Sequence, residues 1–281
     1  MKKPQLITIA TAVFLVAVIY FFGRTTPHKI NSQSGNNSQT SSNSNLTDTI
    51  LNMAKKQLGP DQLLRITNLE ISISGRAAKD QKLKVYHQLA HFWKDTAGFF
   101  LPYAFYEGET ARLENSENSL TFAARLFLDN LQGEQNISFR KWEALQAKDL
   151  FERSLIINPN NDSTKIGLGA CYLFGSISAA PMEGIAKIRE VLDKDSTNVY
   201  GQMILVKGSL MSGQYDKAIS RLQLINRLQP NNLEAILLLA DTYERINDKS
   251  NALKWYVQSL PFATNQEMKA AIEKRIEDLK K

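Results

Sequence analysis

Apolar residues recur every three or four positions through most of the chain beyond residue 46, and short clusters of Ser, Thr, Asn, Gly and Pro interrupt them. This period is typical of amphipathic helices, and interruptions at short intervals favour antiparallel helix pairs. The segment LEISIS, residues 69–74, alternates like a strand but has no obvious partner run. The pattern therefore predicts an all-α fold. The clearest predicted helices cover Asp80–Asp95, Ser119–Leu131, Trp142–Ile157 and the chain from Thr164 onward.

The stretch SGQYDKAISRLQLINRLQPNN, residues 212–232, carries the signals of a repeated unit. Gly213 precedes a helical run, Ala218 lies inside the run, and Pro230 with two asparagines follows it. Ser196 stands 34 residues before Pro230, and the helical segments ahead of both positions align. Three further pairs share the spacing of 34 residues: Val199 with Leu233, Ile188 with Leu222, and Val191 with Ile225.

This period resembles the tetratricopeptide repeat, whose 34-residue unit is a pair of antiparallel helices. The unit before the one that starts at Val199 carries LGACY, residues 168–172, which matches the core of the first helix in the family's repeat. The turn between the two helices of this unit is about three residues longer than the turn in the family's repeat. The resemblance implies a right-handed superhelical solenoid of antiparallel helix pairs. The signature positions are matched by Leu205, Gly213, Tyr215, Ala218, Leu222, Ile225 and Pro230 in one unit, and by Ile236, Leu239, Ala240, Tyr243, Ala252, Tyr256 and Ser259 in the next.

Looser units flank this array. Upstream, Ala124 and Ala147 are the expected small residues at a helix crossing, with QGEQNISFRK looping out between the two helices. Downstream, Thr264 and Glu267 form a possible capping box ahead of an amphipathic final helix. We therefore expect a degenerate helical region over 47–118, repeats over 119–264, and a C-terminal capping helix over 265–281.

The N-terminal region has a different composition. Between Lys3 and Arg24 lie 20 uncharged, mostly apolar residues, enough for a helix of about 30 Å. We expect an uncleaved transmembrane anchor over 1–24, with a cleaved signal peptide as the alternative. A polar linker over 25–46 follows, and its segment 31–45 contains only Asn, Ser, Gln, Thr and Gly, which predicts a disordered tether. The lysines ahead of the span weakly favour a cytoplasmic N-terminus.

The charge distribution argues against nucleic-acid binding. The chain has a formal net charge of +6, but residues 1–47 supply four basic residues and no acid. The remainder therefore has a net charge of only +2, without the basic excess that a nucleic-acid footprint needs. The net charge thus belongs mostly to the membrane end.

No motif points to catalysis, a cofactor, a metal or a small-molecule substrate. His87 and His91 share a helix face, but Gln88 stands where a zinc protease has glutamate, and no third ligand cluster follows. Cys171, the single cysteine, is expected to be a buried small hydrophobe. The aromatic cluster over 99–106 is expected to be core. We therefore expect a protein that is not an enzyme.

The family resemblance implies that the first helix of each pair lines a concave face and presents its positions 2, 5 and 9 to a partner. The expected contacts are an apolar strip with acidic residues at one end, which suits a largely apolar peptide with or without a basic end. Burial of these side chains in the core is the alternative. The residues are Ser163, Ile166, Ala170, Tyr200, Met203, Lys207, Glu234, Leu237 and Asp241.

These features suggest a membrane-anchored scaffold or chaperone-like adaptor that binds protein or peptide partners during complex assembly. In outline it resembles bacterial cytochrome c biogenesis factors and translocon-associated tetratricopeptide proteins. That resemblance implies a single-pass protein of the bacterial inner membrane with its repeats in the periplasm. The alternative is a cytosol-facing receptor for preproteins or chaperones, although Lys207 alone is a poor match to the basic, Asn-rich clamp of chaperone-binding members.

Overall fold

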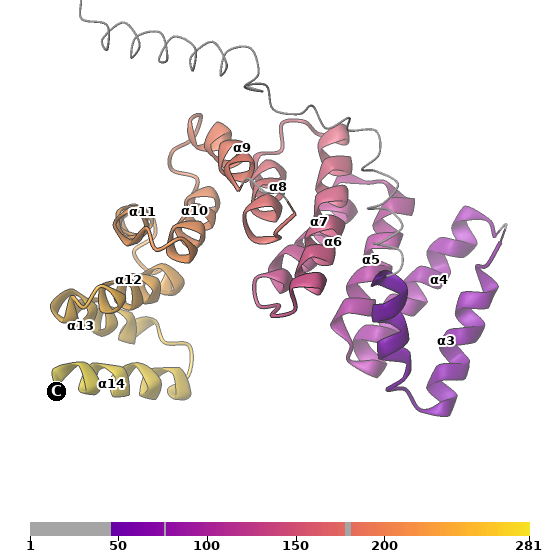
Figure 1. Ribbon diagram of the computed structural model, residues 1–281, viewed down its shortest axis with the longest axis horizontal. Coiled ribbons are helices and arrows are strands. Elements are labelled where there is room, and N and C mark those ends of the chain that lie inside the picture. Colours follow the sequence, from indigo (N-terminus) through magenta and orange to yellow (C-terminus); the bar gives the residue numbers. More distant parts are fainter. Residues whose placement is uncertain (1–45, 76, 178–180) are drawn as a thin grey trace, which may run out of the picture. The chain divides into compact units, whose positions relative to one another are not determined.

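The computed structural model describes residues 46–75, 77–177 and 181–281, and the regular structure within them is helical (Figure 1). The predicted anchor, and all of the predicted linker except Leu46, lie outside the described residues. Within the described ranges, every helix is too short or too polar to span a bilayer. The first of the described helices covers 46–55. The elements that follow are α3 Pro60–Ser72, α4 Lys79–His91, a π-helical segment Phe92–Ala97, α5 Phe100–Glu114, α6 Glu117–Leu131, α7 Ile137–Ile157, α8 Asp162–Phe174, α9 Met182–Leu192, α10 Val199–Met211, α11 Tyr215–Leu228, α12 Leu233–Arg245, α13 Lys249–Ser259, a 3₁₀ turn Leu260–Phe262, and α14 Gln266–Lys280.

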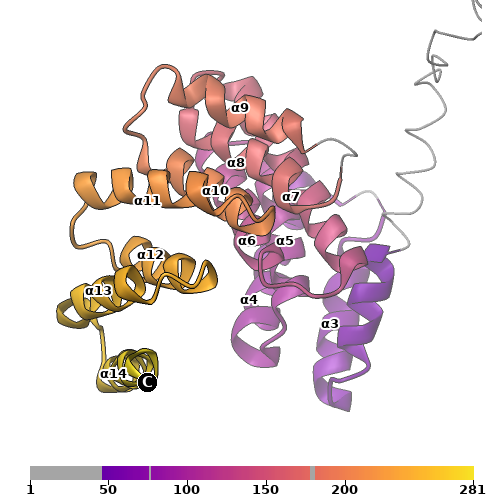
Figure 2. The same ribbon diagram turned by 60° about the vertical axis from the view of Figure 1, so that its left-hand side comes forward.

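The helices repeat in the predicted register. Helices α10 and α12 begin 34 residues apart, at Val199 and Leu233, and α11 and α13 begin 34 residues apart, at Tyr215 and Lys249. Each helix from α3 to α14 contacts the next one along the chain, so successive pairs lie side by side (Figures 1 and 2). This arrangement confirms the predicted all-α solenoid of tetratricopeptide type.

Asparagine side chains fix the start of the first helix in three successive pairs. Asn161, Asn198 and Asn232 are the N-cap residues of α8, α10 and α12. Each side-chain oxygen accepts a hydrogen bond from the backbone N–H three residues on, at 2.9, 3.0 and 3.0 Å respectively. Such caps satisfy N–H groups that have no partner within the helix. The segment PNN at 230–232 therefore separates α11 from α12 and starts the next unit.

Small residues lie where the helices of a pair cross. Ala218 and Ala252 have no exposed surface, and the same holds for Ala124 and Ala147 in the looser upstream unit. The predicted crossing residues are thus confirmed as buried. In the α8–α9 pair the crossing is tighter still, because a Cβ atom added to Gly184 would lie 2.3 Å from the carbonyl oxygen of Gly169.

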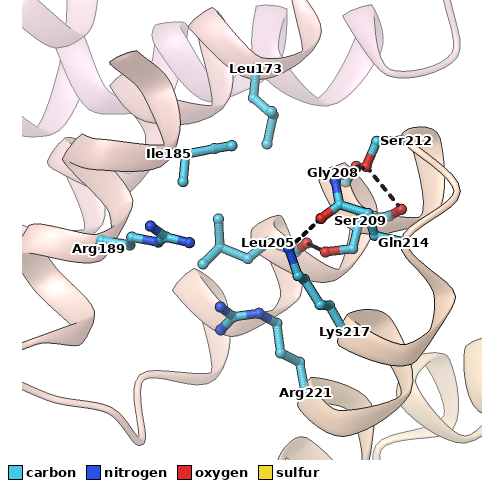
Figure 3. A pocket seen from close by; sticks show the side chains of 10 residues that line it. All are labelled: Leu173, Ile185, Arg189, Leu205, Gly208, Ser209, Ser212, Gln214, Lys217 and Arg221. Carbon is cyan, nitrogen blue, oxygen red and sulfur yellow. Dashed lines mark hydrogen bonds between the residues drawn. The ribbon is translucent and has the colours of Figure 1, made fainter. Parts of the chain in front are cut away.

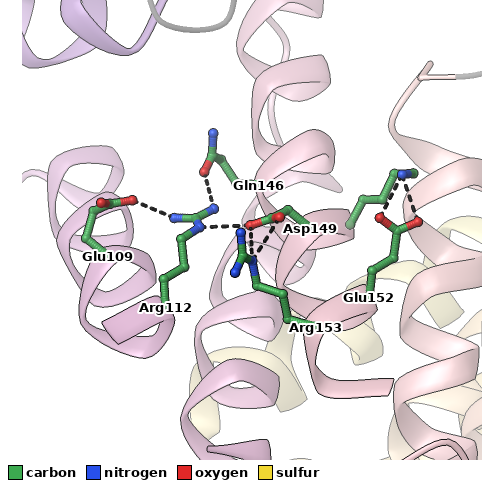
Figure 4. Close-up of polar contacts among 7 residues, drawn as sticks. Glu109, Arg112, Gln146, Asp149, Glu152 and Arg153 are labelled. Carbon is green, nitrogen blue, oxygen red and sulfur yellow. Dashed lines mark hydrogen bonds and ion pairs between the residues drawn. The ribbon is translucent and has the colours of Figure 1, made fainter. Parts of the chain in front are cut away.

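Polar contacts join the N-terminal helices to the repeats (Figure 4). Arg112 of α5 donates from Nε to Asp149 and from Nη2 to Gln146, both on α7, at 2.8 and 2.7 Å. Its Nη1 also donates to Glu109 at 2.8 Å. Because the Arg112 side chain is only 18% exposed, these charge-assisted bonds lie in a partly desolvated position between the two helices.

Two local predictions were wrong. Helix α7 begins at Ile137 inside the expected loop, because the side chain of Asn136 accepts from the N–H groups of Ser138 and Phe139. The alternating segment 69–74, for which no partner run was expected, agrees with the all-α prediction, because residues 69–72 form the end of α3. The last helix is capped by Asn265 and not by Thr264, and the Asn265 side chain accepts from Met268 N at 2.8 Å.

Candidate partner-binding face

The first helices of successive pairs, α6, α8, α10 and α12, contribute side chains that meet on one face. Arg125 of α6 donates to Ser163 of α8 at 2.5 Å, and its guanidinium lies 5.7 Å from the ring centre of Tyr200 on α10. Lys207 of α10 lies 3.0 Å from Glu234 of α12. We call the surface joined by these contacts the first-helix face.

The structure divides the predicted contact residues into two groups. Ile166 and Ala170 have no exposed surface and Met203 is 7% exposed, so these three apolar side chains belong to the core. The accessible members are Ser163, Tyr200, Lys207 and Leu237, which are half-buried, and Glu234 and Asp241, which are exposed.

The accessible members already have interactions within the chain. Burial raises the pKa of Tyr200 to about 12, with the nearby Asp129 adding to the shift. Asp241 accepts a hydrogen bond from the hydroxyl of Tyr256 at 2.5 Å. The expected apolar strip is therefore not continuous. Among its accessible residues, only Tyr200 and Leu237 have a largely apolar side chain.

A hollow of about 340 Å³ opens beside Lys207. Its apolar walls include the buried Phe174 and the 66% exposed Met211, at the ends of α8 and α10. Arg140 reaches it from α7, where its Nε donates to the backbone oxygen of Glu134 at 2.9 Å. The hollow thus combines apolar walls with two cations. Its lining residues are Leu131, Gln132, Arg140, Phe174, Lys207, Leu210 and Met211.

Sequence reasoning missed Arg125 and most of the hollow. Arg125 is the ninth residue of α6, the same position that Lys207 occupies in α10 and Asp241 in α12. Extending the positional pattern to the looser upstream unit would therefore have identified it. The hollow residues have no such signal, because Phe174, Leu210 and Met211 read as ordinary core positions.

The residues considered for metal or thiol chemistry have other roles. His87 lies 3.6 Å from Glu114, and His91 Nδ1 lies 2.6 Å from Asp95. In the part of the chain that the structure describes, no three His, Cys, Asp or Glu side chains are grouped to hold a metal. Cys171 is fully buried in α8, as predicted, and burial raises the pKa of its thiol.

The helix pairs and their first-helix face define a helical-repeat solenoid of tetratricopeptide type. No protein-family model matches the chain. The chain is 26% identical over 234 residues to lipopolysaccharide assembly protein B of Haemophilus influenzae. The match covers 82% of this chain and 56% of that relative, so the chain spans about half the length of the curated relative it matches.

Solved structures of low sequence identity are also similar. YrrB, described as a tetratricopeptide protein with an unusual peptide-binding site, is 13% identical with a TM-score of 0.41, covering 70% of this chain and 92% of its own. MamA from Desulfovibrio magneticus is 18% identical with a TM-score of 0.43, covering 67% and 99%.

Proposed function

We propose that this chain is a membrane-tethered scaffold that binds protein or peptide partners on its first-helix face during the assembly of a complex. The observation that carries the proposal is the hollow of about 340 Å³ next to Lys207, where apolar walls and two half-buried cations lie together. Assembly, and not catalysis, is supported by the name of the Haemophilus influenzae relative, which refers to lipopolysaccharide assembly.

The chemistry of the face indicates the kind of segment that fits it. An apolar side chain of a partner would contact Phe174 and Met211, because burying such surface is the main favourable term in peptide binding. A neighbouring carboxylate would reach Arg140 or Lys207. Farther along α12, the exposed Asp241 suits a basic residue, whereas Glu234 is already paired with Lys207. A largely apolar peptide with charges of opposite sign at its two ends satisfies the whole face.

The tether is part of the same proposal. The apolar run between Lys3 and Arg24 would anchor the chain in the bacterial inner membrane, and the polar linker would hold the repeats on the periplasmic side. Protease added to spheroplasts should then digest the repeats. Protection in spheroplasts combined with digestion in inverted vesicles would instead favour a cytosol-facing receptor.

Binding can be tested with charge insertions on exposed residues. Met211→Glu places a carboxylate in the apolar wall of the hollow, whereas Val257→Glu places one on α13, where Val257 is 50% exposed and does not line the hollow. Proteins co-purified with the full chain after mild detergent extraction should lose a defined partner in Met211→Glu and keep it in Val257→Glu. Equal capture by both variants, at equal melting temperatures, would rule out the hollow as the binding site.

A further inference from the structure

A second recess, separate from the hollow, lies where the α8–α9 pair meets the α10–α11 pair (Figure 3). Its volume is about 70 Å³. The side chains of Leu173, Ile185 and Leu205 form an apolar wall. We call this recess the basic cleft because three cations line it, namely Arg189, Lys217 and Arg221.

The three cations lack carboxylate partners. All 28 acidic residues of the chain are among the described residues, and none of their carboxylates lies within 4.0 Å of Arg189, Lys217 or Arg221. Glu190, the neighbour of Arg189 in the sequence, pairs instead with Lys165 at 3.5 Å and Lys194 at 3.6 Å. The cleft therefore keeps an uncompensated positive charge.

Neutral groups hold two of these cations in place. Arg221 donates from Nη1 to the side-chain oxygen of Gln202, which is only 5% exposed. Gln202 in turn donates to the backbone oxygen of Ser196 at 2.8 Å. Lys217 donates to the amide oxygen of Gln214 at 2.6 Å. Because amide oxygens position a cation without neutralising it, the full charge remains available to a ligand.

The two arginines also face each other. Their guanidinium groups extend toward the same space from α9 and α11 (Figure 3). Burial, together with the charge of Arg189, lowers the pKa of Arg221. Two like charges beside an apolar wall repel each other, and an anion placed between them would remove this repulsion.

We propose that the basic cleft binds a single phosphate group. Guanidinium groups recognise phosphate through pairs of parallel hydrogen bonds, and a dianion matches three cations better than a carboxylate does. The recess is small, and the proposal places only the phosphate group inside it. The group can come from soluble phosphate or from the phosphomonoester headgroup of a lipid such as phosphatidic acid. This inference does not depend on peptide binding at the first-helix face.

The experiment measures thermal stability and amide chemical shifts of the full chain in a neutral detergent. The probes are inorganic phosphate and water-soluble dihexanoyl phosphatidic acid, each compared with chloride at equal ionic strength. Wild type should show a saturable rise in melting temperature and shifts at Gly208 and Ser209, because a ligand that binds only the folded state stabilises it. Arg189→Gln and Arg221→Gln should lose this response, whereas Arg227→Gln, with the same charge loss elsewhere on α11, should keep it.

Each outcome supports the proposal, overturns it or identifies the source of the phosphate group. Responses to both probes support phosphate binding with soluble phosphate as a sufficient source, and a response to phosphatidic acid alone supports a lipid headgroup. Without ligand, Arg189→Gln should melt no lower than wild type, because the substitution removes repulsion and no ion pair. No response to either probe beyond chloride, or an unchanged response in Arg189→Gln and Arg221→Gln, would overturn the proposal.

Discussion

The two helices of a pair cross at small residues in both the α8–α9 and the α12–α13 pair, but the residues differ. In α12–α13 the helices meet over Ala240 and Ala252, which are fully buried. In α8–α9 they meet over Gly169 and Gly184, and an added Cβ at Gly184 would approach the Gly169 oxygen to 2.3 Å. A methyl group therefore fits one crossing and not the other. The repeat position requires a small residue, and the local approach of the backbones decides how small it must be.

The largest expected effect comes from Gly184→Leu. The added side chain would contact the backbone oxygen of Gly169 at 2.3 Å and Tyr172 Cβ at 2.9 Å, so a buried helix would have to move. Overpacking of this kind costs about 3 kcal/mol. Denaturant unfolding should show a lower midpoint with an unchanged slope. A loss no greater than that of Ala252→Leu would mean that the α8–α9 and α12–α13 crossings are equivalent.

Smaller losses are expected at the alanine crossings. Ala218→Leu and Ala252→Leu add three carbon atoms at fully buried positions and should each cost about 1–3 kcal/mol. Ala270→Leu on the exposed side of α14 is the matched control and should change stability by less than about 0.5 kcal/mol. If the control were as destabilising as the crossing variants, leucine itself and not the crossing would be responsible.

The α6–α7 pair differs from both by containing a buried acid. Glu143 has no exposed surface, its Oε1 accepts from Asn130 at 2.5 Å, and its Oε2 has no partner among the described residues. Burial raises the pKa of Glu143 to about 8 from its ordinary value of 4.5. The folded state therefore retains a proton that the unfolded state loses, and stability should fall as pH rises from 4.5 to about 8.

Glu143→Gln removes this titration. The variant should gain stability relative to wild type as pH rises toward 8, by about 4 kcal/mol for a pKa shift of this size, and little near pH 4, as measured by unfolding across that range. Asn130 keeps an amide oxygen as its acceptor in the variant. Parallel pH profiles for the two proteins would show that Glu143 titrates normally.

The smallest effect is expected at the C-terminal cap. Arg275 of α14 donates a hydrogen bond from its Nε to Oε2 of Glu244 on α12, at 2.9 Å. The Arg275 side chain is half exposed. Because solvent and salt screen such a pair, Arg275→Gln should lower the melting temperature slightly at low salt and less at high salt. A large, salt-independent loss would assign α14 a greater role in stability.

The repeated part of the fold was predictable because one signal, small and apolar residues at a 34-residue period, coincides with asparagine caps at Asn198 and Asn232. The start of α7 was missed because Asn136 caps a helix that begins with residues typical of a loop. The tightness of the Gly184 crossing was also missed. A glycine in a sequence indicates a turn, and only the structure shows that Gly184 lies against the backbone of Gly169.

The candidate sites were less predictable. Positional rules placed Tyr200 and Lys207 on the correct face, but they also selected Ile166, which the neighbouring helices cover completely. The basic cleft draws Arg189, Lys217 and Arg221 from two helices of successive pairs. Its charge depends on which carboxylates lie nearby in space, and sequence spacing alone does not show this.

Site-specific photocrosslinking in cells tests the central claim, partner binding on the first-helix face, most directly. In the test variants, a benzophenone side chain would replace Met211 or Leu237 on that face. In the control variants, it would replace Ile156 or Val257, which are exposed on the second helices α7 and α13. The account predicts adducts of the same partner from Met211 and Leu237 and none from Ile156 or Val257. Equal adducts from all four positions, or adducts only from the second helices, would contradict it.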